Sequence, residues 1–445
     1  MGGEFWMLEN PSLRVQGKFT AEVGKQPEAC LSAGLVADPR VHVFNTPCGG
    51  KGVAFSADPA KSIQAFQPIT LHGQLDSGES VTLLDAQNHG GDGQFSPPPH
   101  YVAGAAVLGA HVAGTDQPYS AVRFRIDDPY WLAHLAAGES SVVADDGSTL
   151  SVEASEEGNW LVYASSTPVT LRQLEIRVVS GCLVLAQLVT DQDLVIRDTQ
   201  VRVDANGPWL TVHGPAFCES ANRVNPETLL PREELTVERF AKWIALNDTL
   251  DGLAWAVAKP VEGVLQVQAQ VLTSLVEGLH RRLPYEQSRF PDVTKSAFQR
   301  IREAARHGAG AQAKAEGLDR EQVMQATQFL TEVSFRARAD AVVARVSGAV
   351  PEIVESVPDL PARLTKTRNQ FAHHRLQGKA KKPLALSYRR WLVVTTITPW
   401  LLRSLLLLHA GVDPGTLRDR YLQHQRFAFA RANLAQLLKE LGETR

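Results

Sequence analysis

The spacing of apolar residues changes once along this 445-residue chain, and that change limits the folds open to it. In the first half, Val122, Phe124 and Ile126 alternate with polar neighbours, the two-residue period of a β-strand with one side in water. The same alternation occurs at Leu174, Ile176 and Val178, at Val201 and Val203, and at Leu210 and Val212. After Pro226 apolar residues follow helical spacing, as in Val264, Val267, Val271, Leu275 and Leu279. The sequence therefore predicts an α+β protein with a β-rich N-terminal domain and a helical C-terminal domain.

Turn signals separate the short strands of the first half, which favours a sandwich or barrel-like β domain. A short helix is expected to interrupt these strands at 129–137. In the second half we expect helices at 260–282, 293–307, 318–346, 352–375, 386–409 and 415–441, with a loop at Gly308, Gly310 and Gly317. A boundary near 225–235 gives two domains, 1–228 and 233–445, and the segment 234–258 fits either of them.

Charge is distributed unevenly along the chain. Residues 361–445 contain sixteen Lys and Arg against four Asp and Glu, although the whole chain has a net charge of −3. The preceding residues are therefore strongly acidic. A basic C-terminal region is the better candidate for contact with a polyanion such as a nucleic acid. Attraction between the acidic and basic regions is the alternative explanation.

The cysteines give no sign of a metal centre or a disulfide framework. They are scattered, with no CxxC pair, at Cys30, Cys48, Cys182 and Cys218. The N-terminus contains acidic residues and lacks the apolar core of a signal peptide, so we expect a cytoplasmic protein. No metal or other cofactor is predicted.

A nearly uncharged run from Trp391 to Leu408 is long enough to raise the question of a membrane span. Arg403 and Pro399 interrupt it, and an arginine near the centre of a bilayer costs at least about 2.5–3.5 kcal/mol. A helix buried in a bundle or a dimer explains the same residues without that cost. We therefore predict a core helix and no membrane contact.

The motif RNQFAH, at 368–373, combines side chains that suit the cleavage of RNA without a metal. His373 changes charge near neutral pH and can act as acid or base. Arg368 is always charged and matches phosphate oxygens, and Asn369 can hydrogen-bond a ribose or orient the histidine. In one straight helix Asn369 and His373 share a face while Arg368 lies to the side. The three would converge if the helix bent or a second copy completed the site; otherwise the motif is a charged helix tip beside a core Phe371.

A basic loop follows the motif and is the predicted RNA-binding segment. The predicted RNA-binding residues here are His374, Arg375, Lys379, Lys381 and Lys382. Each lysine or arginine that meets a phosphate releases counterions and adds affinity that does not depend on sequence. The alternative is that these lysines only keep a loop soluble. Trp391 could likewise stack on an unpaired base, or it could begin the buried helix.

Glu277 is a candidate supporting residue on the first long helix of the second half. It could hold Arg368 or His373 in place if the two helices pack together. Arg281 lies four residues later on the same helix face, so a local ion pair is the alternative.

The motif resembles the signature of the HEPN superfamily, in which a polar residue follows an arginine and four to six residues separate that arginine from a histidine. TKTRNQFAHH carries this resemblance. The segments ITLHGQLDSGESVTLLDA and VLTSLVEGLHRRL are similar to ApeA-like proteins, which join an N-terminal β-rich domain to a C-terminal HEPN domain. The resemblance implies a C-terminal helical HEPN bundle that dimerises, so that two copies of the motif share one cleft.

The resemblance also implies a function: a metal-independent endoribonuclease, with His373 as acid or base, Arg368 stabilising the phosphorane and Asn369 orienting the reacting groups. The products would be a 2′,3′-cyclic phosphate and a 5′-hydroxyl. ApeA-like proteins are associated with abortive infection against phage, which implies a phage-derived trigger, a sensing role for the β domain, and cellular RNA such as tRNA as substrate. Two alternatives are a catalytically idle RNA-binding or dimerisation module, and a protein that acts by ligand sensing through the β domain.

Overall fold

The computed structural model divides into two units by its internal contacts. One comprises Met1–Gln187, Gln192–Asn225 and Arg232–Ile244, and the other comprises Leu188–Asp191, Pro226–Pro231 and Ala245–Arg445. The structure describes residues 1–22, 24–35, 41–46, 50–60, 63, 67–89, 98–127, 135, 141–155, 158–191, 194–214, 228–259, 261–326, 332–372 and 384–443. The short helix predicted at 129–137 lies almost wholly outside the described residues.

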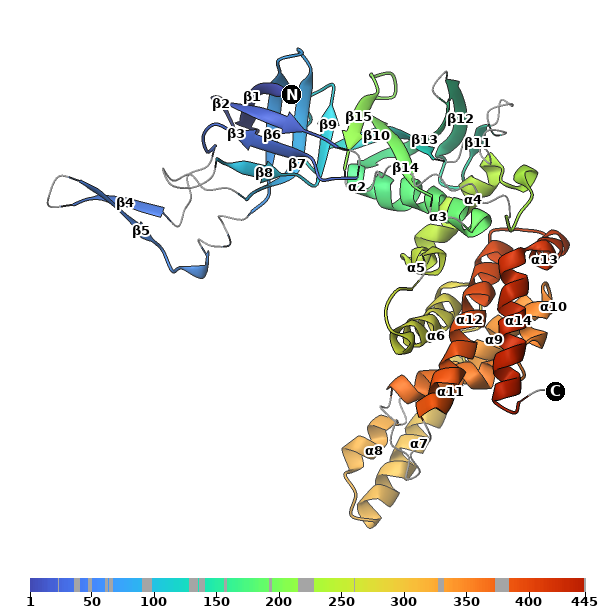
Figure 1. The fold of residues 1–445 in the computed structure, drawn as a ribbon. Helices are drawn as coiled ribbons and strands as arrows, with labels where there is room; N and C mark the ends of the chain where they lie inside the picture. The colour runs from blue at the N-terminus through green and yellow to red at the C-terminus, as the bar shows by residue number, and fades with distance from the viewer. Residues whose placement is uncertain are drawn as a thin grey trace. The chain divides into compact units, whose positions relative to one another are not determined.

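Six strands of the N-terminal unit close into a barrel (Figure 1). They are β1 Gly2–Met7, β2 Asn10–Thr20, β3 Glu28–Leu31, β6 Ile69–Leu75, β7 Ser80–Asn88 and β8 His100–Val102. The barrel closes because β8 pairs with both β3 and β7. Its interior is apolar and includes Phe5 and Phe19, both fully buried. At Gly73 a Cβ atom would lie 2.6 Å from the Phe5 ring, so only glycine lets β6 pass this core side chain.

The sheet continues beyond the barrel through β9, which pairs with β7. The added strands are β9 Ala105–Leu108, β10 Pro118–Ile126, β11 Ser141–Val143, β12 Thr149–Ser155, β13 Gly158–Thr170, β14 Ile196–Arg202 and β15 Leu210–His213. A separate hairpin is formed by β4 Val41–Asn45 and β5 Lys51–Phe55. On β10 the predicted alternation is confirmed, because Val122, Phe124 and Ile126 are buried while Arg123 and Arg125 are half-buried. The barrel-like β domain is likewise confirmed.

The strand predicted at Leu174, Ile176 and Val178 is wrong. This segment is helical, with α2 Leu171–Gln173, the π-helix η2 Leu174–Val179 and α3 Ser180–Thr190 in succession. A capping box starts it, in which Thr170 accepts from the backbone N–H of Gln173 and the Gln173 side chain accepts from that of Thr170. Ile176 is 60% exposed, so its apparent alternation was accidental.

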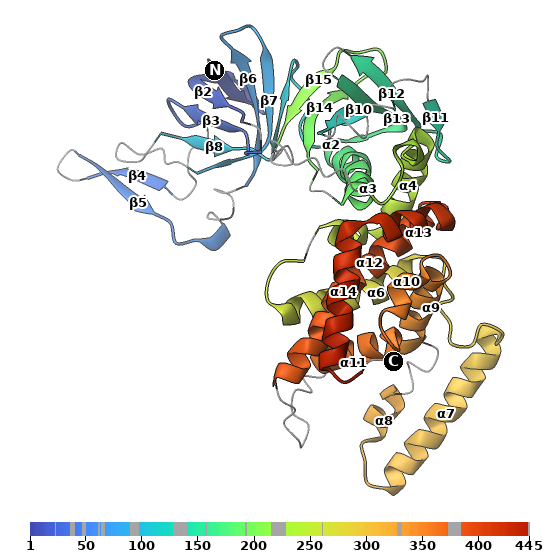
Figure 2. The ribbon, with the colours of Figure 1, turned by 45° about the vertical axis from the view of Figure 1, so that its right-hand side comes forward.

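The C-terminal unit is a bundle built around one long helix (Figure 2). Its helices are α5 Leu253–Ala258, α6 Leu265–Arg282, α7 Lys295–Ala315, α8 Arg320–Ala326, α9 Phe335–Ser347, α10 Pro351–Glu355, α11 Leu360–Ala372, α12 Leu384–His409, α13 Pro414–Gln423 and α14 Gln425–Glu440. Before them come the 3₁₀ turn η3 Arg232–Glu234 and α4 Val237–Leu250, which runs from one unit into the other. The central helix is α12, which contacts α5, α6, α9, α10, α11 and α14.

Several predicted helices have different limits in the structure. The expected loop at Gly308 and Gly310 is wrong, because α7 runs through both residues. At Gly310 the absence of a side chain lets Met324 of α8 approach, since a Cβ atom on this residue would lie 3.0 Å from the Met324 sulfur. The helix predicted at 318–346 is two helices, α8 and α9. Likewise 352–375 divides into α10 and α11 at Asp359, whose φ is 47°, and 415–441 divides into α13 and α14 at His424.

The apolar run of α12 lies largely within the bundle. The helical segments Leu171–Thr190 and Ala385–His409 are long and apolar enough to span a membrane. In the apolar 18-residue stretch of each, however, 72% and 67% is buried inside the protein, as in the core helices of soluble proteins. Arg403 is accommodated by an ion pair with Asp191, which follows α3, and Arg426 of α14 approaches the same carboxylate at 2.7 Å. Asp191 and Arg403 are only 12% and 13% exposed, so their charges are nearly buried together.

Candidate active site

Arg368 and Asn369 lie near the end of α11, where they line an open cleft of about 410 Å³. The other walls are the face of α6 that carries Glu277 and the segment 332–336 at the start of α9. The charged groups around the cleft are four arginines and two glutamates: Arg281, Arg289, Arg336 and Arg368, with Glu277 and Glu332. The cleft is therefore net positive, as a site for an anionic substrate should be.

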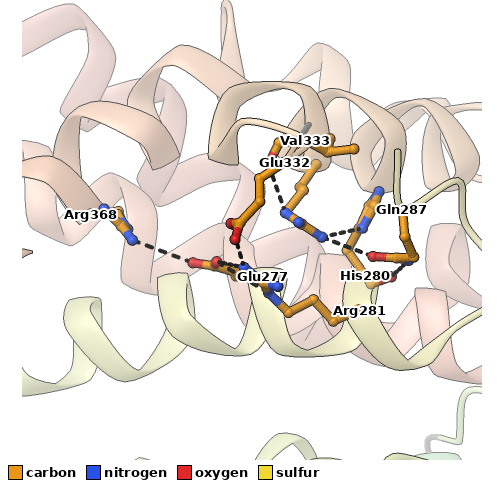
Figure 3. Close-up of polar contacts among 8 residues, drawn as sticks. Glu277, His280, Arg281, Gln287, Glu332, Val333 and Arg368 are labelled. Atoms are coloured by element: carbon orange, nitrogen blue, oxygen red, sulfur yellow. Dashed lines mark hydrogen bonds and ion pairs between the residues drawn. The ribbon is translucent and has the colours of Figure 1, made fainter. Parts of the chain in front are cut away.

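Four of these groups form a chain of alternating charge (Figure 3). Arg368 Nη2 lies 3.6 Å from one carboxylate oxygen of Glu277, and Arg281 Nη2 lies 3.0 Å from the other. Arg281 also reaches Glu332 at 3.6 Å. Both interpretations of Glu277 are thus realised together, since it pairs with its helix neighbour and with the motif arginine.

The residues that follow Arg368 and Asn369 anchor the end of α11 against α12. Gln370 accepts a hydrogen bond from the indole N–H of Trp391 at 3.2 Å, and the ring of Phe371 lies 5.6 Å from that indole. Trp391 is only 1% exposed. Of the two interpretations of Trp391, the structure supports the buried helix, although α12 begins earlier, at Leu384; a base stacked on this ring is excluded in this conformation.

The cleft continues into a second cavity of about 450 Å³ along α11. Arg336, Thr365 and Asn369 line both, and Lys366 adds a further cation to the second. The two cavities together form one groove that passes the motif. An extended chain with regular negative charges fits such a groove better than a small compact ligand does.

Six of the predicted site residues lie outside the described residues: His373, His374, Arg375, Lys379, Lys381 and Lys382. Their roles remain predictions, and so does the convergence of Arg368 and His373 on one site. Across the parts of the chain that the structure describes, no three His, Cys, Asp or Glu side chains are grouped so that they could hold a metal.

Sequence reasoning missed a partly buried network next to the cleft, which joins Arg338, His280 and Gln287. In the structure, Arg338 Nη1 donates to His280 Nδ1 at 3.2 Å and to Gln287 Oε1 at 3.0 Å. Burial and the nearby Arg338 lower the pKa of His280 to about 4, so the imidazole is neutral at physiological pH. One signal was available: Arg338, Val342 and Val346 are spaced by four, which places an arginine in the apolar stripe of its helix.

Comparison with known proteins identifies one family. Residues 272–416 match the family described as Apea-like HEPN. This segment begins within α6 and extends into α13, so it contains Glu277, Arg281, Arg338 and the motif. No curated protein and no solved structure matches the chain.

Proposed function

We propose that this protein is a metal-independent endoribonuclease that cuts RNA at the α11 cleft, because residues 272–416 match the Apea-like HEPN family. The observation that carries the proposal is the placement of Arg368: a permanently charged guanidinium, held by Glu277 in an open, net positive groove. Such a group can stabilise the charge that develops on a phosphorane. The N-terminal β-rich unit fits the domain arrangement of ApeA-like proteins.

In the proposed reaction the 2′-hydroxyl of one nucleotide attacks the adjacent phosphorus. His373 removes the hydroxyl proton or protonates the leaving 5′-oxygen, and the second histidine of a dimer takes the other role. Arg368 neutralises the phosphorane oxygens, and Asn369 orients the ribose. The bond to the 5′-oxygen breaks, which leaves a 2′,3′-cyclic phosphate and a 5′-hydroxyl. DNA is not a substrate because it lacks the nucleophile.

The wider role is proposed from the family alone. We place the protein in the cytoplasm, as a homodimer through its HEPN domain, in abortive infection after a phage-derived trigger. The basic loop with His374, Arg375, Lys379, Lys381 and Lys382 would hold the RNA backbone, and tRNA offers unpaired nucleotides in its anticodon loop. The β-rich unit would sense the trigger and restrain the nuclease.

Cleavage of total bacterial RNA by the purified protein in EDTA tests the proposal. We expect the wild type to leave cyclic-phosphate ends and His373→Ala to be inactive. His307→Ala is the matched control, since His307 lies on α7 and does not line the cleft, and it should cut like the wild type. Cutting by His373→Ala would exclude the proposed site. RNA that is bound but never cut, even in phage-infected cells, would instead support the idle RNA-binding module.

A second prediction concerns Glu277. Glu277→Gln keeps the shape of the side chain but removes the charge that faces Arg368, so the guanidinium loses its fixed direction. We expect the single-turnover cleavage rate to fall about tenfold, or about 1.4 kcal/mol in activation free energy, with little change in RNA affinity.

The control for this prediction is Glu352→Gln. Glu352 likewise forms an ion pair with an arginine, Arg418, but neither residue lines the cleft. An unchanged cleavage rate for Glu277→Gln would show that Arg368 needs no help from this carboxylate.

A further inference from the structure

Arg338 of α9 is a buried cation without a carboxylate partner in direct contact. Its side chain is 2% exposed, and within the described residues no acidic oxygen forms an ion pair with it. Burying a guanidinium in this way is costly, and an apolar side chain of similar length would avoid the cost. The reason for an arginine must therefore lie in what it holds.

Three chain segments meet at this guanidinium. Nη1 donates to His280 of α6 and to Gln287 of the segment after α6, and Nε donates to the carbonyl of Val333, before α9, at 3.1 Å. Gln287 in turn donates to the carbonyl of His280 at 2.9 Å. A lysine has one nitrogen and cannot reproduce this fork of donors. Figure 3 shows the acceptor residues His280, Gln287 and Val333 beside Arg281 and Glu332 of the charge chain.

The same point is the base from which the α7–α8 hairpin leaves the bundle. Ser288 and Glu332 pair there as an isolated antiparallel bridge. The cleft is lined by Arg289 from one side of this base and by Glu332, Ser334 and Phe335 from the other side. The position of this cleft wall relative to α6 therefore depends on the contacts of Arg338.

We infer that Arg338 is a positioning residue that holds the cleft wall, Glu332–Arg336, against α6 and so presents the groove to a single-stranded RNA backbone. This inference rests on the proposed function for its ligand. Arg338 itself contacts no RNA, since it is buried. Its removal should weaken binding without changing the number of phosphates that the protein neutralises.

The salt dependence of binding separates this role from direct contact. The probe is a fluorescent single-stranded RNA of mixed sequence with 2′-O-methyl riboses, which cannot be cut, and the protein is the full chain. For Arg338→Lys and Arg338→Met we expect a dissociation constant raised about tenfold at every salt concentration, with an unchanged slope of log affinity against log salt. The comparison variant is Arg289→Met, which removes an exposed cleft cation and should reduce that slope by about 0.7.

Amide hydrogen exchange on the same proteins provides a readout that needs no RNA. Exchange at Glu332–Arg336 should be faster in Arg338→Lys than in the wild type, while the core of α12 is unchanged. Wild-type exchange in this segment, or wild-type affinity in a folded Arg338→Lys, would overturn the inference.

If the wild type binds no RNA, the proposed function fails, and exchange alone decides whether Arg338 positions the wall. If both Arg338 variants fail to fold, Gln287→Leu, which removes one acceptor at the base, takes their place in both measurements.

Discussion

Replacing Arg368 with alanine is expected to lower the single-turnover rate of RNA cleavage at least about a hundredfold. Loss of one group that stabilises developing charge in a transition state typically costs about 10²–10³ in rate. Arg368 has the required setting, because it is partly exposed, faces an open cleft and is fixed by Glu277. The loss should appear in the rate constant rather than in RNA affinity, since the other cleft arginines still attract the backbone.

Two further variants make this result specific. Arg368→Lys keeps the charge but loses the planar fork, and we expect it to recover only a small part of the rate. Arg418→Ala is the matched control, because Arg418 also pairs with a single glutamate but does not line the cleft. A rate within a few-fold of the wild type for Arg368→Ala would exclude Arg368 as the group that stabilises the phosphorane.

The second large effect is on stability. Asp191→Asn is expected to destabilise the helical unit by about 3 kcal/mol, because it leaves Arg403 buried in α12 without a counter-charge. Asparagine tolerates the backbone at this position, where φ is 52°, so the substitution tests charge rather than backbone strain. Urea unfolding followed by helical circular dichroism measures the change.

A double-mutant cycle identifies the source of that loss. In an Arg403→Met background the buried cation that faces Asp191 is gone, so Asp191→Asn should cost less than half as much. Arg426 is 61% exposed, and Arg426→Met alone should cost under about 1 kcal/mol. Equal costs of Asp191→Asn in both backgrounds would show that the buried pair is not what stabilises the bundle.

The same carboxylate predicts a dependence of stability on pH. Burial would raise the pKa of Asp191, but Arg403 and Arg426 outweigh burial and hold the pKa below its ordinary value. A lowered folded-state pKa means that the stabilisation is complete above the unfolded-state pKa, near 4, and is lost as pH falls through the folded value. The difference in stability between wild type and Asp191→Asn should therefore shrink in acid and stay constant at neutral pH.

Structure is predicted most reliably from the sequence where it depends on the regular spacing of residues within one strand or helix. Apolar periodicity identified the β-rich and helical halves, and the spacing of Glu277 and Arg281 identified their ion pair, because both depend on neighbours within one strand or helix. The contact of Glu277 with Arg368 depends on how α6 packs against α11, so the sequence left it as one of two alternatives. Arg338 was missed because its acceptors lie on three separate segments. The helix at Leu174 was mistaken for a strand because a short apolar run fits both periods until its burial is known.

The base of the α7–α8 hairpin also affects how this domain can be altered. The Ser288–Glu332 bridge brings together two points of the chain on either side of the hairpin, and the 21 residues of α7 bury only Gly310 and Ala313. The bundle therefore draws little of its core from α7. Homologous domains should vary most in length here, and a laboratory version should accept a short turn, a fluorophore or a whole inserted domain between Arg289 and Glu332 while keeping the helices of the cleft in place.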